Sequence, residues 1–177
     1  MKTKKVFIDF GSGPSVKWLI YYKKLGYYTV SVNKLFRDLK SKDIEYLKLI
    51  TDEMFFFDFS DLSNKCGNHK ADNWICGAVL EHVEPEKIDG FLQNMINHSK
   101  DNFIGEISID LSDHKGGFRH YENFENDEWL FIKNILKKDE WYEKIHKYFD
   151  ISSYREGFKF KDKQNRPTTL FFTVSKK

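Results

Sequence analysis

The chain has 177 residues, of which 29 are basic and 27 are acidic, so its net charge is +2. This length predicts one domain, residues 1–177, and a hydrophobic content of 40% excludes a disordered chain. The near balance of charge gives no electrostatic support for nucleic-acid binding.

Strand and helix patterns alternate through most of the chain. An apolar strand at 5–10 is followed by a helix at 15–25, which Gly26 ends, and Pro85 suits the first turn of a later helix. Further strands are predicted at 27–32, at 54–57, within 74–80 and at 103–109. Further helices are predicted at 35–50 and 129–145, and polar loops at 60–71 and 110–124.

The last two strands, at 148–160 and 168–174, are separated by a polar turn containing Pro167. Because no helix fits between them, we expect an antiparallel hairpin. The alternation before them predicts a mostly parallel sheet with helices on both faces. The predicted fold class is therefore α/β, a Rossmann-like three-layer sandwich with a seven-stranded sheet and a C-terminal antiparallel hairpin.

A glycine turn directly follows the first strand. Residues 6–13 read Val-Phe-Ile-Asp-Phe-Gly-Ser-Gly, so that Asp9, Gly11 and Gly13 stand where a parallel strand gives way to a helix. Glycines let the backbone turn sharply and approach a ligand closely. The pattern predicts a nucleotide-type cofactor, although Asp9 and Asp58 taken singly are ordinary acids at strand ends.

Three segments together resemble the class I S-adenosylmethionine-dependent methyltransferases. They are Asp-Phe-Gly-Ser-Gly-Pro-Ser at 9–15, Phe-Asp-Phe at 57–59, and 71–83, which contains Leu-Glu-His-Val. The resemblance covers nearly the whole chain and implies S-adenosylmethionine as cofactor. It implies cofactor binding by Asp9, Gly11, Ser12, Gly13, Asn33, Asp58, Phe59, Gly77 and Ala78.

Within that resemblance, Asp58 is expected at the adenine amino group, and Phe59 either stacks near the adenine or belongs to the core. The chain departs from the family pattern where Ser15 replaces the third glycine and Asn33 replaces the acid that binds the ribose. An amide lacks the charge-assisted hydrogen bond of a carboxylate, so we expect modest cofactor affinity. The helix that commonly precedes the first strand is also missing, and another segment or a partner subunit, including a second copy, is expected to cover the cofactor.

The candidate catalytic residues are His114, Asp113 and Glu81. Methyl transfer is an in-line displacement, and a hydroxyl or ammonium acceptor needs a base to take its proton. His114 follows the fifth strand with Asp113 beside it, which fits a base; the alternative is a solvated loop histidine. Glu81 is expected to line the acceptor pocket, whereas His82 is better explained by structural packing.

The leading prediction, from the motifs at the strand ends and the Asp113-His114 loop, is a methyltransferase acting on a small-molecule or glycan acceptor. The segment 109–114 is also similar to one in bacterial methyltransferases often associated with glycan or other surface-molecule biosynthesis. The alternatives are a binding module without independent activity, cleavage of the cofactor, an RNA methyltransferase and a nicotinamide-dependent oxidoreductase. The segment 77–80 lacks the Asn/Asp-Pro-Pro-aromatic motif of nucleic-acid amino methylation.

The sequence also predicts a cytoplasmic protein. Its only cysteines, Cys66 and Cys76, match no zinc pattern and make no disulfide scaffold, and no metal is expected. Asp9 interrupts the first apolar run, so neither a signal peptide nor a membrane span is predicted.

Overall fold

The computed structural model describes residues 4–11, 16–33, 41–57, 59–63, 65–111, 136–161 and 167–177. Its strands are β1 (Val6–Phe10), β2 (Tyr28–Asn33), β3 (Glu53–Phe56), β4 (Ala71–Gly77), β5 (Ser99–Asp110), β6 (Phe149–Lys161) and β7 (Pro167–Lys176). Its helices are α1 (Lys17–Lys24), α2 (Ser41–Ile50), α3 (Ile88–Asn97) and α4 (Lys138–Tyr148), with short 3-10 turns η1 (Leu80–His82) and η2 (Pro85–Lys87).

All these strands join one seven-stranded sheet in the order β3-β2-β1-β4-β5-β7-β6. Neighbouring strands from β3 to β5 pair in parallel, and β7 pairs antiparallel with both β5 and β6. The predicted fold class is confirmed, including the antiparallel C-terminal hairpin. Because β1 to β5 are parallel, their carboxyl ends lie along one edge of the sheet.

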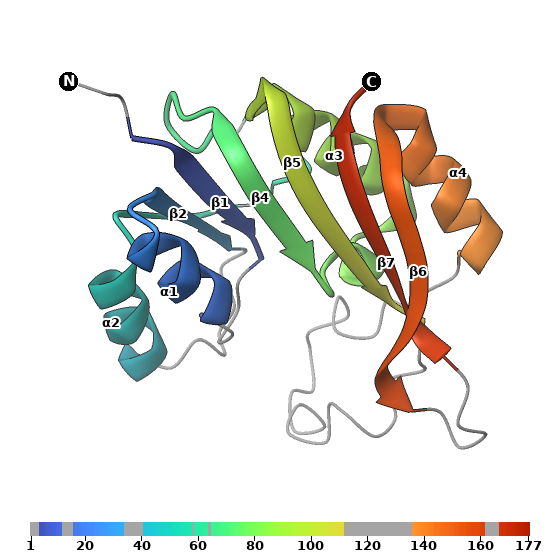
Figure 1. Ribbon diagram of the computed structural model, residues 1–177, viewed down its shortest axis with the longest axis horizontal. Helices are drawn as coiled ribbons and strands as arrows, with labels where there is room; N and C mark the ends of the chain where they lie inside the picture. The colour runs from blue at the N-terminus through green and yellow to red at the C-terminus, as the bar shows by residue number, and fades with distance from the viewer. Residues whose placement is uncertain are drawn as a thin grey trace.

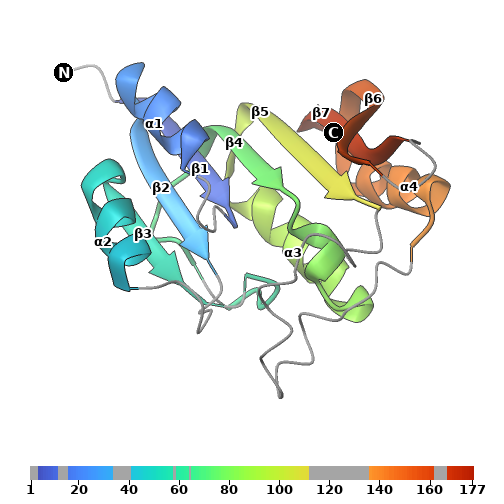
Figure 2. The same ribbon diagram turned by 90° about the horizontal axis from the view of Figure 1, so that it is seen from below.

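Helices lie on both faces of the sheet, as Figures 1 and 2 show: α1 and α2 cover one face, and α3 and α4 cover the other. The alternation of side chains along β1 explains this arrangement, since Phe7 packs with Leu19 and Leu47 on the first face. Ile8 and Phe10 point the other way, into the core shared with α3 and α4.

The segment after β3 is anchored on α3 by close backbone contacts. A Cβ added at Gly90 would lie 2.5 Å from the carbonyl oxygen of Ser60, so only glycine admits the loop there. Asn94 Nδ2 donates to the carbonyl oxygens of Phe59 at 3.0 Å and Asp61 at 3.4 Å. These contacts hold the loop against the helix next to the carboxyl end of β3.

Several predicted boundaries were wrong. The fourth strand is Ala71–Gly77 rather than within 74–80, because Ala78 has a positive φ of 57° and ends the strand before Leu80. The fifth strand begins earlier, at Ser99, which pairs with Ala71 of β4, because the first residues of the strand are polar and give no apolar signal. Pro167 starts β7 and pairs with Lys161, a position at which a strand tolerates proline.

Two helix predictions are only partly covered by the described residues. The helix expected at 35–50 is described from Ser41 to Ile50, and the helix expected at 129–145 from Lys138, ending three residues late at Tyr148. The predicted loop at 110–124 lies outside the described residues from 112 onward. Cys66 and Cys76 are both buried free thiols, and burial raises the pKa of Cys66 to about 12.

One half of one sheet face carries no helix in the described part of the chain. In Figure 1, α1 and α2 stand in front of β1, β2 and β3, whereas β4, β5, β7 and β6 are bare on that side. The exposure of β5 reflects this: Ile104 is 54% exposed, although its strand lies inside the sheet. We call this area the open face, and it adjoins the carboxyl ends of β1 and β4.

Candidate functional site

The turn after β1 is shaped by Gly11 at the carboxyl edge of the sheet. Gly11 has a φ of 92°, and its N–H donates to the carbonyl oxygen of Val32 at 2.7 Å. A Cβ at this position would overlap the side chain of Val79, which follows β4. Both the backbone conformation and the space therefore require glycine here.

The turn after β4 is the neighbour of that glycine turn. Ala78 adopts the left-handed conformation with a φ of 57°, which is strained for a residue with a Cβ, and its N–H donates to the carbonyl oxygen of Ser108 at 2.9 Å. Strained residues of this kind concentrate at ligand-binding sites. The two turns together make a compact cradle of backbone where β1 and β4 end.

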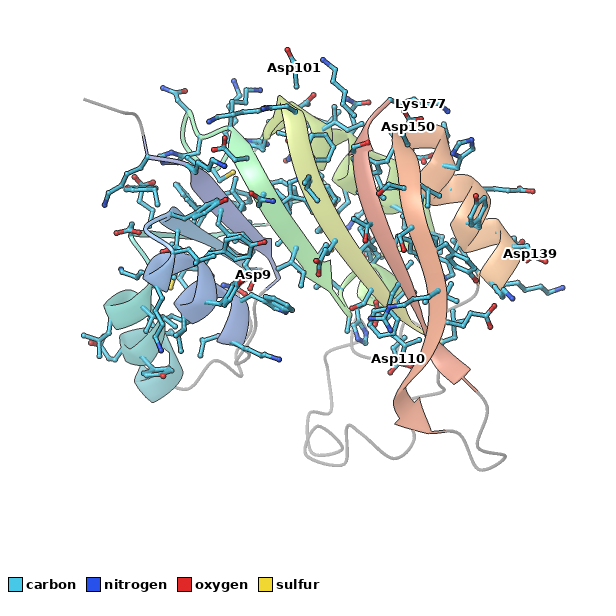
Figure 3. The ribbon with its side chains drawn as sticks, in the orientation of Figure 1. Asp9, Asp101, Asp110, Asp139, Asp150 and Lys177 are labelled. Atoms are coloured by element: carbon cyan, nitrogen blue, oxygen red, sulfur yellow. The ribbon has the colours of Figure 1, made fainter. Side chains whose placement is uncertain are left out.

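Glu81 lies just behind this cradle and joins it to the end of β5. Its side chain is 2% exposed, and Oε1 accepts a hydrogen bond from the backbone N–H of Asp110 at 3.0 Å. Asp110 is itself fully buried at the carboxyl end of β5, where Figure 3 labels it. Glu81 therefore fixes the spacing of two neighbouring strand ends, and it does not belong to the described lining of the hollow on the open face.

Asp9 is a buried acid at the edge of the hollow. It is 4% exposed, and no described residue donates a hydrogen bond or forms an ion pair to its carboxylate. Burial raises the pKa of Asp9 well above its usual value, because the ionised form loses water and gains no counter-charge. Figure 3 shows Asp9 near the end of β1, beside α1. A cationic ligand group would supply the missing partner.

Two other predicted cofactor residues are buried. Asn33 ends β2 with 1% exposure, and its Nδ2 donates to Ser31 Oγ at 2.7 Å. Phe59 is 4% exposed and packs against Phe10 and Phe91, with ring centroids 4.7 Å and 5.2 Å away. Phe59 is therefore a core residue, as one of the two interpretations predicted, and its contact with adenine stays a prediction.

A hollow of about 300 Å³ opens from the cradle onto the open face. Asp9, Gly11 and Gly77 line it at the cradle, and Trp18 borders it from α1. Its floor continues across the sheet and includes Ile75, Glu106, Ser108, Ser153, Arg155, Phe171 and Thr173. The hollow thus combines ring and aliphatic surfaces with hydroxyl groups, carboxylates and one guanidinium group, as small-molecule sites do.

The structure brings five predicted residues to the carboxyl edge, namely Asp9, Gly11, Asn33, Gly77 and Ala78. The predicted residues Ser12, Gly13, Asp58, Asp113 and His114 lie outside the described residues.

Sequence reasoning missed Trp18, Glu106, Ser108, Arg155 and Phe171, which line the hollow. The alternation of polar residues in β5 could have indicated Glu106 and Ser108, whereas nothing local indicated Arg155. The described residues contain no cluster of three metal-ligating side chains and no helix long and apolar enough to cross a bilayer.

No protein-family model matches the chain, and no curated protein matches it. Solved structures do match. A TehB-like S-adenosylmethionine-dependent methyltransferase of Corynebacterium glutamicum is 13% identical, with a TM-score of 0.65 over 100% of this chain and 83% of that one. A putative S-adenosylmethionine-dependent methyltransferase of Listeria monocytogenes is 14% identical, with a TM-score of 0.68 over 99% and 92%.

A third similar structure contains ligands. The 1,6-didemethyltoxoflavin N1-methyltransferase of Burkholderia thailandensis, solved with bound 1,6-didemethyltoxoflavin and S-adenosylhomocysteine, is 14% identical, with a TM-score of 0.67 over 98% of this chain and 71% of that one. The chain therefore has the fold of S-adenosylmethionine-dependent methyltransferases, and the resemblance expected from its sequence is confirmed at that level.

Proposed function

We propose that the chain binds S-adenosylmethionine and transfers its methyl group to a small-molecule or glycan acceptor. Similar folds belong to methyltransferases solved with S-adenosylhomocysteine or with sinefungin, one of them a glycopeptide N-methyltransferase. Because a fold alone does not fix a function, the proposal depends on the site itself.

The observation that carries the proposal is the buried Asp9 carboxylate at the cradle. Burying an ionisable group without a partner is unfavourable, so such a group is retained where a ligand completes it. S-adenosylmethionine carries a sulfonium and an ammonium group, and either cation is a suitable partner for Asp9. Gly11 supports the same assignment, because the turn that its positive φ and its fit against Val79 allow lines the hollow beside Asp9.

The remaining cofactor contacts follow the edge of the sheet. We assign the ribose to Asn33 at the end of β2, with Gly77 and Ala78 bordering the cofactor from β4. Asp58 and Phe59 remain the proposed adenine contacts. S-adenosylmethionine, when bound, supplies an electrophilic methyl group, and the chain's own part is to hold the acceptor in line with it.

A proton must leave the acceptor if its nucleophile is a hydroxyl or ammonium group. His114 with Asp113 remains the proposed base. Glu81 remains a second candidate, but its Oε1 already accepts the Asp110 N–H, so its support of the strand ends accounts for its burial without a proton transfer. The Asp110 contact therefore makes Glu81 the weaker of the two candidates.

The test is calorimetric titration with S-adenosylmethionine and S-adenosylhomocysteine, with NAD as the control ligand. We expect saturable binding of the first two and none of NAD. Gly11→Ala should weaken binding by tenfold or more, since the added Cβ would clash with Val79 and displace the turn. Gly26→Ala is the matched control, because Gly26 also has a positive φ, 83°, but has open space around its Cβ position. An absence of binding by both cofactor forms would overturn the proposal.

A further inference from the structure

The open face carries two rows of side chains that cross from the cradle to the C-terminal hairpin. In one row, Gly77 pairs with Ser108, Ser108 with Phe171, and Phe171 with Arg155. The other row runs parallel to it and contains, in order, Asp9, Ile75, Glu106, Thr173 and Ser153. The hollow therefore extends from the proposed cofactor edge to β6.

An irregularity in β6 places Arg155 on this face. Ile151 pairs with Val174, but Ser153 pairs with Thr173, so Ser152 is an extra residue in the strand. Ser152 Oγ donates to the carbonyl oxygen of Thr173 at 3.1 Å and occupies the bulge. Because side chains alternate between faces, a regular strand would turn Arg155 toward the helix-covered core. The bulge instead presents a charged side chain to the hollow.

The guanidinium group of Arg155 lies over the ring of Phe171. Its Cζ lies 4.1 Å from the centroid of that ring, which is a cation–π contact. Among the residues that the structure describes, none forms an ion pair with Arg155. A cation–π contact uses none of the N–H donors of the guanidinium group, which form the fork that matches a carboxylate or a phosphate.

The charge of Glu106 and the distance from Arg155 to the cradle limit where an anion can bind in the hollow. Glu106 lies one row away on β5 and repels an anion in the middle of the hollow, so the position favoured for an anion is at Arg155. The backbones of Gly77 and Arg155 are about 14 Å apart, because three strand spacings of about 4.8 Å separate them. A small ring compound fits between the Arg155 side chain and the cradle, with Trp18 and Ile75 offering it apolar surface.

We propose that the hollow is the acceptor site and that Arg155, which lies over Phe171, selects a small ring compound bearing a carboxylate or a phosphate. The acid group binds at the β6 end, and the ring extends toward the cradle, where the atom to be methylated meets the cofactor. This proposal rests on the proposed methyl transfer for its biological meaning, but the anion site itself can be tested without the cofactor.

The experiment is an NMR titration of the full chain with benzoate, phenyl phosphate and benzyl alcohol, followed at the Arg155 Nε–H and at the backbone of 106–108 and 153–157. We expect saturable shifts with millimolar benzoate or phenyl phosphate and much weaker ones with neutral benzyl alcohol. The stronger of the two anions identifies the acid group. Arg155→Gln should weaken anion binding by about tenfold or more, and Arg155→Lys should restore only part of it.

Lys48→Gln is the matched control, because it removes the same charge from the exposed surface of α2 and should leave anion binding unchanged. Glu106→Gln should strengthen anion binding, since a repelling charge is removed. Equal shifts in Arg155→Gln and the wild-type chain, or no saturable shift with either anion, would overturn the anion site. Titration of the same samples with S-adenosylhomocysteine separates the two proposals, because Arg155→Gln should leave that affinity intact.

Discussion

Gly11 and Val79 contact each other across the carboxyl edge of the sheet, one from the turn after β1 and the other from the turn after β4. The contact admits no Cβ at Gly11, whose φ of 92° already disfavours any other residue. Two segments almost seventy residues apart in the chain thus pack together only because residue 11 is a glycine, with a hydrogen atom in place of a Cβ.

This contact predicts that the effect of Gly11→Ala depends on Val79. We expect Gly11→Ala to lower the free energy of unfolding by about 2–4 kcal/mol, from backbone strain and overpacking together. Val79→Ala should relieve the overpacking, so the double variant should be less destabilised than the sum of the single variants. Chemical denaturation of all four proteins measures this coupling, and strict additivity would contradict the contact.

A substitution at Ala78 should change the free energy of unfolding in the opposite direction. Its φ of 57° is readily adopted by glycine, so Ala78→Gly removes strain. We expect a gain of about 0.5–1 kcal/mol in the free energy of unfolding, reduced by the greater freedom of glycine in the unfolded chain. Ala71→Gly in buried β4 is the contrasting control and should destabilise. A loss of stability in Ala78→Gly would show that the left-handed turn carries no strain.

Asp9→Asn should stabilise the fold and weaken the binding of the cofactor. Burial raises the pKa of Asp9, so its ionised form opposes folding as the pH rises through that pKa, whereas protonation relieves the cost at lower pH. The amide has no such cost, and we expect a gain on the order of 1–3 kcal/mol at neutral pH.

The same residue should make cofactor binding pH-dependent. The wild-type chain should bind S-adenosylmethionine more tightly as the pH rises through the raised pKa of Asp9, because only the carboxylate attracts a cation. Asp9→Asn should bind more weakly and with little pH dependence, which calorimetry at several pH values measures. Unchanged affinity in Asp9→Asn would argue against Asp9 as the cation's partner.

The loop after β3 should detach from α3 when a larger residue replaces Gly90. A Cβ at Gly90 would lie 2.5 Å from the Ser60 carbonyl oxygen, so Gly90→Ala should destabilise by about 1–3 kcal/mol. Asn94→Ala removes the hydrogen bonds to Phe59 and Asp61 and should cost a similar amount. Hydrogen exchange at 59–63 should rise in both variants, while Gln93→Ala, at a half-buried position of the same helix, serves as the control. Unchanged exchange would contradict the anchoring.

His98 should make the fold sensitive to mild acid. Its Nδ1 donates to the Asn94 carbonyl oxygen at 2.9 Å, while Nε2 accepts the Cys66 N–H at 3.2 Å, so the ring is neutral. Burial lowers the pKa of His98 below 6.5. Below pH 6.5 the unfolded chain binds a proton that the folded chain resists, so stability falls until the pH passes the folded-state pKa.

Thermal unfolding between about pH 7.5 and about pH 5.5 tests this sign. The wild-type chain should lose stability toward the acid end, and His98→Gln should lose less, although it should be less stable throughout. His146→Gln, at an exposed position on α4, should retain the wild-type pH dependence. A wild-type pH dependence in His98→Gln would assign the effect to another group.

The sequence by itself determined the fold class, the glycine turn after β1 and the terminal hairpin. Local sequence patterns predict these features: alternating apolar residues, the positions of glycine and proline, and helical spacing along α3. The glycine turn indicated Asp9 and Gly11, and the resemblance to methyltransferase motifs implied Asn33, Gly77 and Ala78. These positions lie together because parallel strands bring their carboxyl ends to one edge whatever the details of packing.

Only the tertiary structure decided which side chains share the open face. Arg155 reaches the row of Gly77 and Ser108 because β7 inserts between β5 and β6 and because Ser152 bulges from β6. The side-chain alternation of a strand has a period of two, so one extra residue moves every later side chain to the other face. Glu81 likewise contacts Asp110 because the order of strands places β4 beside β5. Pairing of distant strands sets these positions, and no local pattern records it.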